Sequence, residues 1–219
     1  MADSHHVFIT GGTGYMGRRL IPALYARGHR VRALVRRGSE AKLPAGVEAV
    51  VGDALSAATF AGSIAPADTL VHLVGVAHPG PGKERQFHEI DLASVVAAVE
   101  AGKAAGVRHF VYLSVAQPAP AMRAYQAVRA EGERRIAEAG FDATFLRPWY
   151  VLGPGHRWPY LLVPFYALAE LLPATRETAR RVGLVTLPQM VAALVHTVEN
   201  PPMGVRVLDV PAIRVARDA

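Results

Sequence analysis

The apolar positions of this 219-residue chain fall alternately into short runs and into longer stretches with a helical repeat. Short runs rich in β-branched and aromatic residues predict strands. We expect these strands at His6–Thr10, Val31–Val35, Val47–Val51, Thr69–Val74, Phe110–Leu113, Phe141–Leu146 and Val205–Val210. Stretches whose apolar residues share one helical face predict helices at about Gly14–Arg27, Gln86–Ala105, Met122–Ala139 and Pro188–Glu199.

Strands that alternate with helices in this way predict βαβ units joined by right-handed crossovers. The expected fold class is therefore α/β, with a doubly wound parallel sheet between two layers of helices. Ligands of such sheets bind beyond the carboxyl ends of the strands, where the strand order reverses.

We expect residues 1–219 to form a single domain, in which residues 149–219 supply a lid and C-terminal elements integrated with the sheet. Aromatic residues gather after Pro148, and the apolar stretch Tyr160–Leu172 is expected to be a small segment that covers the substrate. Contact of this stretch with a partner or a membrane surface is the alternative, although Pro164 interrupts it.

Composition narrows the classes of protein and site. The chain is 51% hydrophobic and 19% charged, which is typical of a folded domain. It has no cysteine, so disulfide scaffolds and thiolate metal sites are excluded, and its nine histidines lack the spacing of a metal site. No long apolar run or basic leader is present, so we expect a cytoplasmic protein without stable membrane insertion. Monomer and dimer are both open.

Positive charge is concentrated near the N-terminus. The formal net charge is +6, and seven arginines within residues 1–40 face only Asp3 and Glu40. The arginines surround a glycine-rich segment and are not interleaved with aromatic residues, so a small anionic ligand is favoured over nucleic acid.

That segment, TGGTGYMG at residues 10–17, follows a predicted strand and opens a predicted helix. Glycines there permit a tight turn and a close backbone approach, while the helix N-terminus offers N–H donors. The pattern predicts a diphosphate-binding turn. The expected cofactor-binding residues are Gly11, Thr13, Gly14, Tyr15, Met16, Gly17 and Arg18.

Gly11, Gly14 and Gly17 match the TGxxGxxG fingerprint of the short-chain dehydrogenase/reductase superfamily. The segments VVGDAL, GVRHFVYLSV and ATFLRPWYVLGPG are similar to its third strand, its fifth strand, and its sixth strand with the following loop. The chain thus resembles the extended and atypical branches, which include epimerase/dehydratase-like and NmrA-like proteins. The resemblance implies a Rossmann-like fold and a nicotinamide dinucleotide. It places Asp53 and Ala54 near the adenine, with Leu73, Val74, Gly75 and Pro148 as further cofactor contacts.

The choice of dinucleotide is argued from charge. About 20 residues beyond the turn, NAD-binding proteins carry an acidic residue and NADP-binding proteins an arginine. This chain has Arg36 and Arg37 there. Guanidinium groups bind a 2′-phosphate well, so NADP(H) is expected in preference to NAD(H). Simple solvent exposure of both arginines is the alternative.

Superfamily enzymes use Ser, Tyr and Lys, the last two spaced as YxxxK on a helix. Tyr125 and Arg129 keep this spacing with Arg in place of Lys, and Ser114 ends the fifth strand. In the catalytic interpretation Tyr125 handles the proton, Arg129 holds the ribose and lowers the phenol pKa, and Ser114 polarises the acceptor oxygen. In the structural alternative Tyr125 packs on a helix face and Ser114 caps a strand. The substrate walls are expected to be Trp149, Tyr150 and Trp158.

The expected function is NADPH-dependent reduction of a small carbonyl, enone or quinone-like substrate. Because Arg replaces the family Lys, a non-catalytic NADP(H)-binding protein that regulates or assembles a partner is the main alternative. A nucleotide-sugar epimerase or dehydratase is more distant, since the chain is short for the substrate lobe of such enzymes.

Overall fold

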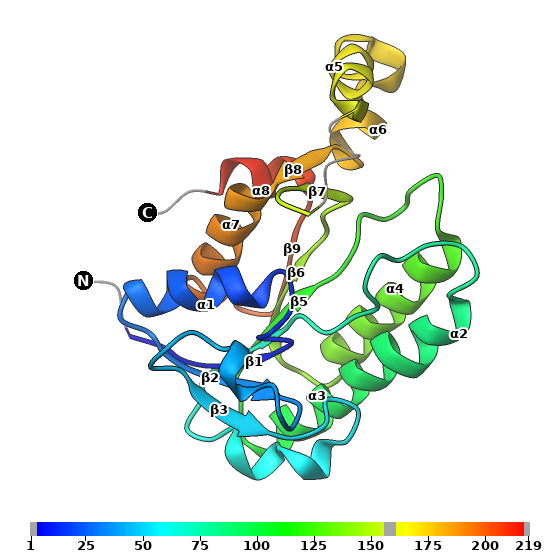
Figure 1. Cartoon of the computed structure of the whole chain (residues 1–219). Coiled ribbons are helices and arrows are strands. Elements are labelled where there is room, and N and C mark those ends of the chain that lie inside the picture. The colour runs from blue at the N-terminus through cyan, green and yellow to red at the C-terminus, as the bar shows by residue number, and fades with distance from the viewer. Residues whose placement is uncertain (1–3, 156–160, 217–219) are drawn as a thin grey trace.

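The computed structural model describes residues 4–155 and 161–216. Its main sheet has seven strands in the order β3-β2-β1-β4-β5-β6-β9, and all neighbouring strands are parallel (Figure 1). Their bounds are β1 His6–Thr10, β2 Arg30–Val35, β3 Glu48–Val51, β4 Thr69–His72, β5 His109–Leu113, β6 Asp142–Leu146 and β9 Val205–Leu208. The strand order reverses between β1 and β4, so the predicted doubly wound, Rossmann-like sheet is confirmed.

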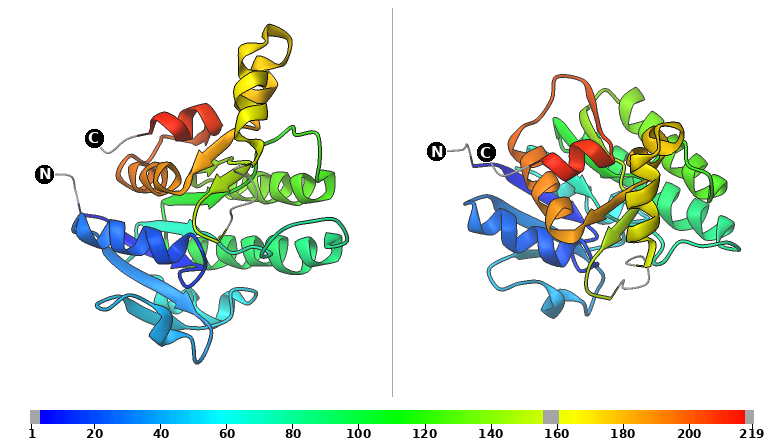
Figure 2. Two further views of the ribbon diagram at one scale, coloured as in Figure 1. Left: turned by 45° about the horizontal axis from the view of Figure 1, so that its top comes forward. Right: turned by 90° about the horizontal axis from the view of Figure 1, so that it is seen from above.

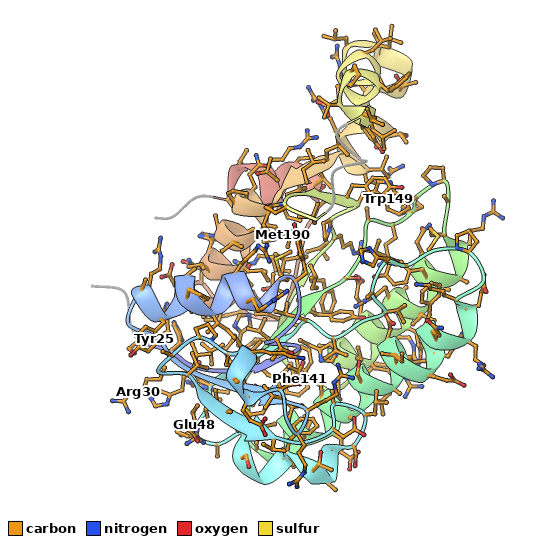
Figure 3. All side chains as sticks on the ribbon, in the orientation of Figure 1. Tyr25, Arg30, Glu48, Phe141, Trp149 and Met190 are labelled. Atoms are coloured by element: carbon orange, nitrogen blue, oxygen red, sulfur yellow. The ribbon has the colours of Figure 1, made fainter. Side chains whose placement is uncertain are left out.

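Helices cover both faces of this sheet (Figure 2). One face packs against α1 (Gly17–Ala26), α7 (Leu187–Glu199) and α8 (Val210–Val215), and the other against α3 (Ala93–Ala104) and α4 (Arg123–Glu138). Successive side chains of β1 point to opposite faces of the sheet. Val7 and Ile9 therefore pack in the first core and Phe8 packs in the second. Met190 of α7, labelled in Figure 3, is fully buried in the first core.

Two predicted helices begin differently. The first starts at Gly17 instead of Gly14, because the Gly14 amide turns back to the Gly11 carbonyl at 2.9 Å. The predicted Gln86–Ala105 helix is divided into α2 (Glu84–Gln86), a π-helical stretch η4 (Phe87–Leu92) and α3. Single π turns are frequent at functional sites, and this one positions a residue of the candidate site.

Short elements complete the connections. Single 3₁₀ turns occur at η1 (Glu40–Lys42), η2 (Ala57–Thr59) and η3 (Ala61–Ser63). A second sheet pairs β7 (Tyr150–Leu152) in parallel with β8 (Leu184–Thr186). Between β7 and β8, α5 (Val163–Leu171) and α6 (Pro173–Arg181) project from the body of the molecule (Figure 1).

Many large apolar side chains of the projecting segment are exposed. Exposed large side chains there are Leu161, Val163, Phe165, Leu168, Leu171 and Leu172. Tyr160 lies outside the described residues, and the expectation that Tyr160–Leu172 covers a substrate stays a prediction. Within the described ranges, none of the helices combines the length and apolar character required to cross a membrane.

Candidate functional site

The glycine-rich turn lies at the carboxyl end of β1, against the chain that leaves β4. Gly11 has a φ of +80°, and a Cβ there would come within 2.9 Å of the Leu73 carbonyl carbon. A Cβ on Gly17 would lie 2.5 Å from the Gly11 and Gly12 carbonyl oxygens. Side chains are thus excluded at both positions, and the first turn of α1 closes tightly on β1.

This geometry fits a dinucleotide diphosphate. The turn sits at the strand-order reversal, and the first-turn amides of a helix have no intrahelical acceptor. The ring of Tyr15 packs against Arg19, whose guanidinium carbon is 4.4 Å from the ring centroid. Thr13 is half-buried and Met16 is buried in the core, so a role of Tyr15 and Met16 toward a diphosphate belongs to their backbone.

The arginines predicted to bind the 2′-phosphate of the adenosine ribose have exposed side chains. Arg36 and Arg37 directly follow β2, and Arg18 lies on the first turn of α1; all three side chains are exposed. The ion pairs found among the described residues use none of the three.

Asp53, predicted near the adenine, follows β3 and is exposed. Its Oδ1 accepts a hydrogen bond from the Leu55 amide at 3.0 Å. This bond closes a local turn around half-buried Ala54. Asp53 therefore shapes the loop beyond β3.

Arg129 is held by both terminal nitrogens of its guanidinium near the carboxyl ends of β4 and β5. Its Nη2 donates to Asp91 Oδ1 at 2.5 Å, and its Nη1 donates to the Leu113 carbonyl at 3.0 Å and the Tyr112 hydroxyl at 3.3 Å. A Cβ on Gly75 would collide with the guanidinium, which therefore fills the space beside Gly75. Burial acts to lower the pKa of Arg129, but the phenol groups of Tyr112 and Tyr125 and the Asp91 carboxylate outweigh it and raise the pKa.

Asp91 is the site residue that sequence reasoning missed. Its side chain is fully buried, and Oδ2 accepts from the Val76 amide at 3.0 Å. The π-helical stretch η4 carries it toward α4. Burial raises the pKa of Asp91, while the Arg129 charge and the Val76 hydrogen bond oppose that shift. The available signal was an acidic residue within an apolar helical pattern, which requires a partner when buried.

Tyr125 lies over the same guanidinium. The Arg129 guanidinium carbon is 5.0 Å from the Tyr125 ring centroid, and the ring also packs on Phe87 at 4.9 Å. Burial raises the pKa of Tyr125 and the Arg129 charge only partly offsets this, so the expected net lowering of the phenol pKa is not found. Tyr125 and Phe87 also line a pocket of about 300 Å³.

Ser114 follows β5 directly, one residue beyond the Leu113 carbonyl that Arg129 binds. Its residue surface is 5% exposed, and in the described part of the chain its Oγ has no hydrogen-bond partner. The Ser114 amide donates to the Leu146 carbonyl at 2.8 Å, so the backbone is firmly placed while the hydroxyl is not engaged.

The residues predicted to wall the substrate follow β6. Pro148 is buried and its carbonyl accepts from the Ala116 amide at 2.9 Å. The rings of Trp149 and Tyr150 meet edge to face at 5.5 Å, and the Trp149 indole hydrogen-bonds to the phenol of Tyr166 on α5. Trp158 lies outside the described residues.

No group of three His, Asp or Glu side chains in the described ranges could hold a metal ion.

The geometry brings together two clusters at the carboxyl edge of the sheet. One is the glycine turn with its arginines, and the other is Tyr125 and Arg129 with Asp91; Ser114 directly follows Leu113, whose carbonyl Arg129 binds.

Comparison with known proteins agrees with this reading of the glycine turn. Residues 11–157, well over half of the chain, match the model of an NAD(P)H-binding family. The chain is 31% identical over 203 residues to a ceramide reductase of Caulobacter vibrioides, covering 90% of this chain and 62% of the relative. It is 32% identical over 225 residues to a 3-diazoavenalumate denitrifying reductase of a Streptomyces species, covering 90% and 73%.

A third relative is a 4-hydroxy-2-methyl-3-oxo-4-farnesyl-3,4-dihydroquinoline-1-oxide ketoreductase of Stigmatella aurantiaca. It is 29% identical over 168 residues, which cover 67% of this chain and 50% of the relative. The chain thus spans between half and two thirds of the length of this ketoreductase and of the ceramide reductase.

Solved structures share the fold. The Bordetella bronchiseptica enzyme WbmH, in complex with NAD+, superposes with a TM-score of 0.69 at 20% identity, covering 94% of this chain and 75% of that one. A short-chain dehydrogenase/reductase superfamily protein from Agrobacterium tumefaciens with bound NAD gives 0.67 at 21% identity, covering 94% and 77%. The resemblance stated from the sequence motifs is confirmed, and the chain belongs to the NAD(P)H-binding family.

Proposed function

We propose that this protein is an NADPH-dependent oxidoreductase that reduces the carbonyl, enone or quinone-like group of a substrate with a large apolar body. The observation that carries the proposal is the buried Ser114 hydroxyl. It has no partner in the described part of the chain and lies beside the Arg129 network. A buried polar group without a partner is costly unless a ligand engages it.

The residues present fit the nicotinamide dinucleotide. Gly11 and Gly17 permit the tight turn, because a Cβ at either position would collide with neighbouring backbone, and such a turn presents helix N-terminal amides to a diphosphate. Arg36, Arg37 and Arg18 are exposed beyond β2 and at the start of α1, where they would bind the 2′-phosphate of NADPH. When bound, the nicotinamide supplies a hydride to the acceptor carbon.

In this proposal, the chain's own residues handle the acceptor oxygen. Ser114 donates a hydrogen bond to it, and Tyr125 transfers the phenol proton to it as the carbon is reduced, which yields the alcohol. The raised pKa of Tyr125 keeps the phenol protonated at neutral pH, as a proton donor requires. Arg129 stabilises the phenolate that remains, because its guanidinium lies over the ring.

The apolar character of the substrate is proposed from two relatives. One is named for ceramide and the other for a quinoline oxide that bears a farnesyl chain. In this chain, Trp149 and Tyr150 supply aromatic surface beyond β6, where such a body would pack.

The test follows hydride transfer from NADPH labelled with deuterium at the reactive carbon, offered with a panel of long-chain ketones and quinones. We expect deuterium in the product alcohol of the parent protein. Tyr125→Phe should retain NADPH binding by calorimetry and lose roughly a hundredfold or more in turnover. The matched control is Tyr25→Phe, because Tyr25 is 55% exposed on α1. Equal turnover of Tyr125→Phe and the control would contradict the assigned role.

One observation favours the non-catalytic alternative. The Arg129 guanidinium is already bound to Asp91, Tyr112 and Leu113, which leaves less of it for a ribose. NADPH binding without deuterium transfer to any acceptor in the panel would support an NADP(H)-binding regulatory or assembly protein instead.

A further inference from the structure

The projecting helix α5 presents a continuous apolar face. Phe165, Leu168 and Leu171 are 71%, 59% and 70% exposed, and Leu172 beyond them is 50% exposed. Phe165, Leu168 and Leu172 follow the i, i+3, i+7 spacing of one helix face. The pair formed by α5 and α6 projects from the rest of the molecule in Figure 1 and in the left view of Figure 2. Exposed apolar patches of this kind mark interaction sites.

Charge on and around α5 identifies the occupant. Glu170 is the one charged residue of α5, and its carboxylate is paired with Arg214 at 2.9 Å. The following helix α6 carries Arg176, Arg180 and Arg181 against a single acidic residue, Glu177. An apolar helix face beside an arginine-rich helix suits the headgroup and acyl boundary of an anionic bilayer. A second copy would bring the same arginines to the contact, which disfavours self-association.

The apolar face is also continuous with the proposed substrate side. Tyr166 of α5 interacts with both Trp149 and Tyr150. Trp149, labelled in Figure 3, lies at the base of the projecting pair. A substrate that moves from the surface bound by α5 toward the end of β6 would therefore contact the rings of Trp149 and Tyr150 first.

We infer that the exposed face of α5, with the arginines of α6, docks this protein on the surface of an anionic lipid bilayer. The inference rests on the proposed function, because the bilayer is where a substrate with a large apolar body is dissolved. Docking holds the reducing site beside that reservoir and shortens the path of the substrate through water.

The test measures co-flotation of the full chain with vesicles of phosphatidylcholine alone and of phosphatidylcholine mixed with phosphatidylglycerol. We expect binding to the mixed vesicles that weakens with added salt. The variant Phe165→Ser/Leu168→Ser/Leu171→Ser should bind about tenfold less, since it removes most of the inserted apolar surface. The control Met203→Ser/Val215→Ser replaces apolar residues that are 99% and 72% exposed elsewhere and should bind as the parent does.

Two results would overturn the docking inference: a parent protein that stays in the lipid-free fraction, or a triple variant that floats as well as the parent. A dimer in solution that the triple variant dissolves would assign the face to a second copy and would equally overturn it. NADPH titration of the same preparations without vesicles reports on the proposed function separately. Failure there would leave the flotation result intact.

Discussion

Asp91 and Arg129 form a buried ion pair across η4 and α4, with Asp91 Oδ1 2.5 Å from Arg129 Nη2 and side-chain exposures of 0% and 6%. The pair connects the chain after β4, through the Val76 amide, to the carboxyl end of β5, through the Leu113 carbonyl. It therefore holds the chain that leaves β4 against the carboxyl end of β5.

Asp91→Asn should lower the free energy of unfolding by about 3–5 kcal/mol, because it leaves a buried guanidinium without its counter-charge. Urea unfolding followed by circular dichroism measures the change. The matched control is Glu138→Gln, which breaks the exposed pair with Arg134 and should cost less than about 1 kcal/mol. Similar losses in the two variants would show that the Asp91 pair does not stabilise the fold.

Replacing Arg36 and Arg37 together with Ala should weaken NADPH binding by at least about tenfold, while NADH binding changes by less than about twofold. The reason is that only NADPH carries the 2′-phosphate. Calorimetric titration of both nucleotides provides the measurement. Arg30→Ala serves as the control, since Arg30 is exposed at the opposite end of β2. Equal weakening of both nucleotides would count against NADP preference.

Ser114→Ala separates function from stability. Its Oγ has no partner in the described part of the chain, so the variant should change the free energy of unfolding by less than about 1 kcal/mol and reduce turnover about a hundredfold. Ser94→Ala gives the contrast, because Ser94 Oγ pairs with His72 Nε2 at 3.2 Å and donates to the Asp91 carbonyl at 3.0 Å. A Ser114→Ala variant with parental turnover would exclude the acceptor role.

Acid should destabilise the protein partly through His72. Burial, together with the charge of Arg129, lowers the pKa of His72 from 6.5 to about 3. Between these values the unfolded chain binds one more proton at this residue, so stability falls as pH falls, by up to about 1.4 kcal/mol per pH unit.

His109 adds to the same loss, since burial lowers its pKa to about 4. Replacing His72 with Asn should reduce the slope of unfolding free energy against pH in this window by up to about 1.4 kcal/mol per pH unit, the value for one bound proton. Urea unfolding at a series of pH values measures this slope. A variant slope equal to that of the parent would show that His72 is not buried in its neutral form.

Local sequence signals were sufficient for the sheet and the cofactor turn. The seven predicted strands correspond to the seven strands of the main sheet, with end residues that shift by a few positions, such as the end of β4 at His72. The turn at residues 10–17 was equally predictable, because Gly17 must avoid the carbonyl oxygens of Gly11 and Gly12 within the βα turn itself.

The sequence predicted only part of the candidate catalytic cluster. The spacing of Tyr125 and Arg129 places both on one helix face, and the structure agrees. Nothing in that spacing indicates that Asp91, 38 residues earlier, takes up the guanidinium. Nor does it show that burial outweighs the Arg129 charge at the Tyr125 phenol, because desolvation depends on every element packed around the ring.

The sequence by itself determined the alternation of strands and helices, the glycine-rich βα turn and the excess of arginine near it, because these depend on residues adjacent along the chain. Only the tertiary structure decided which groups accept hydrogen bonds from Arg129. It also decided that large apolar side chains of α5 are exposed. The physical reason is that pairing and burial are properties of surfaces brought together by folding. A hydrophobic pattern shows which side chains favour burial. The surface that buries them is decided by the packing of elements that are distant in the sequence.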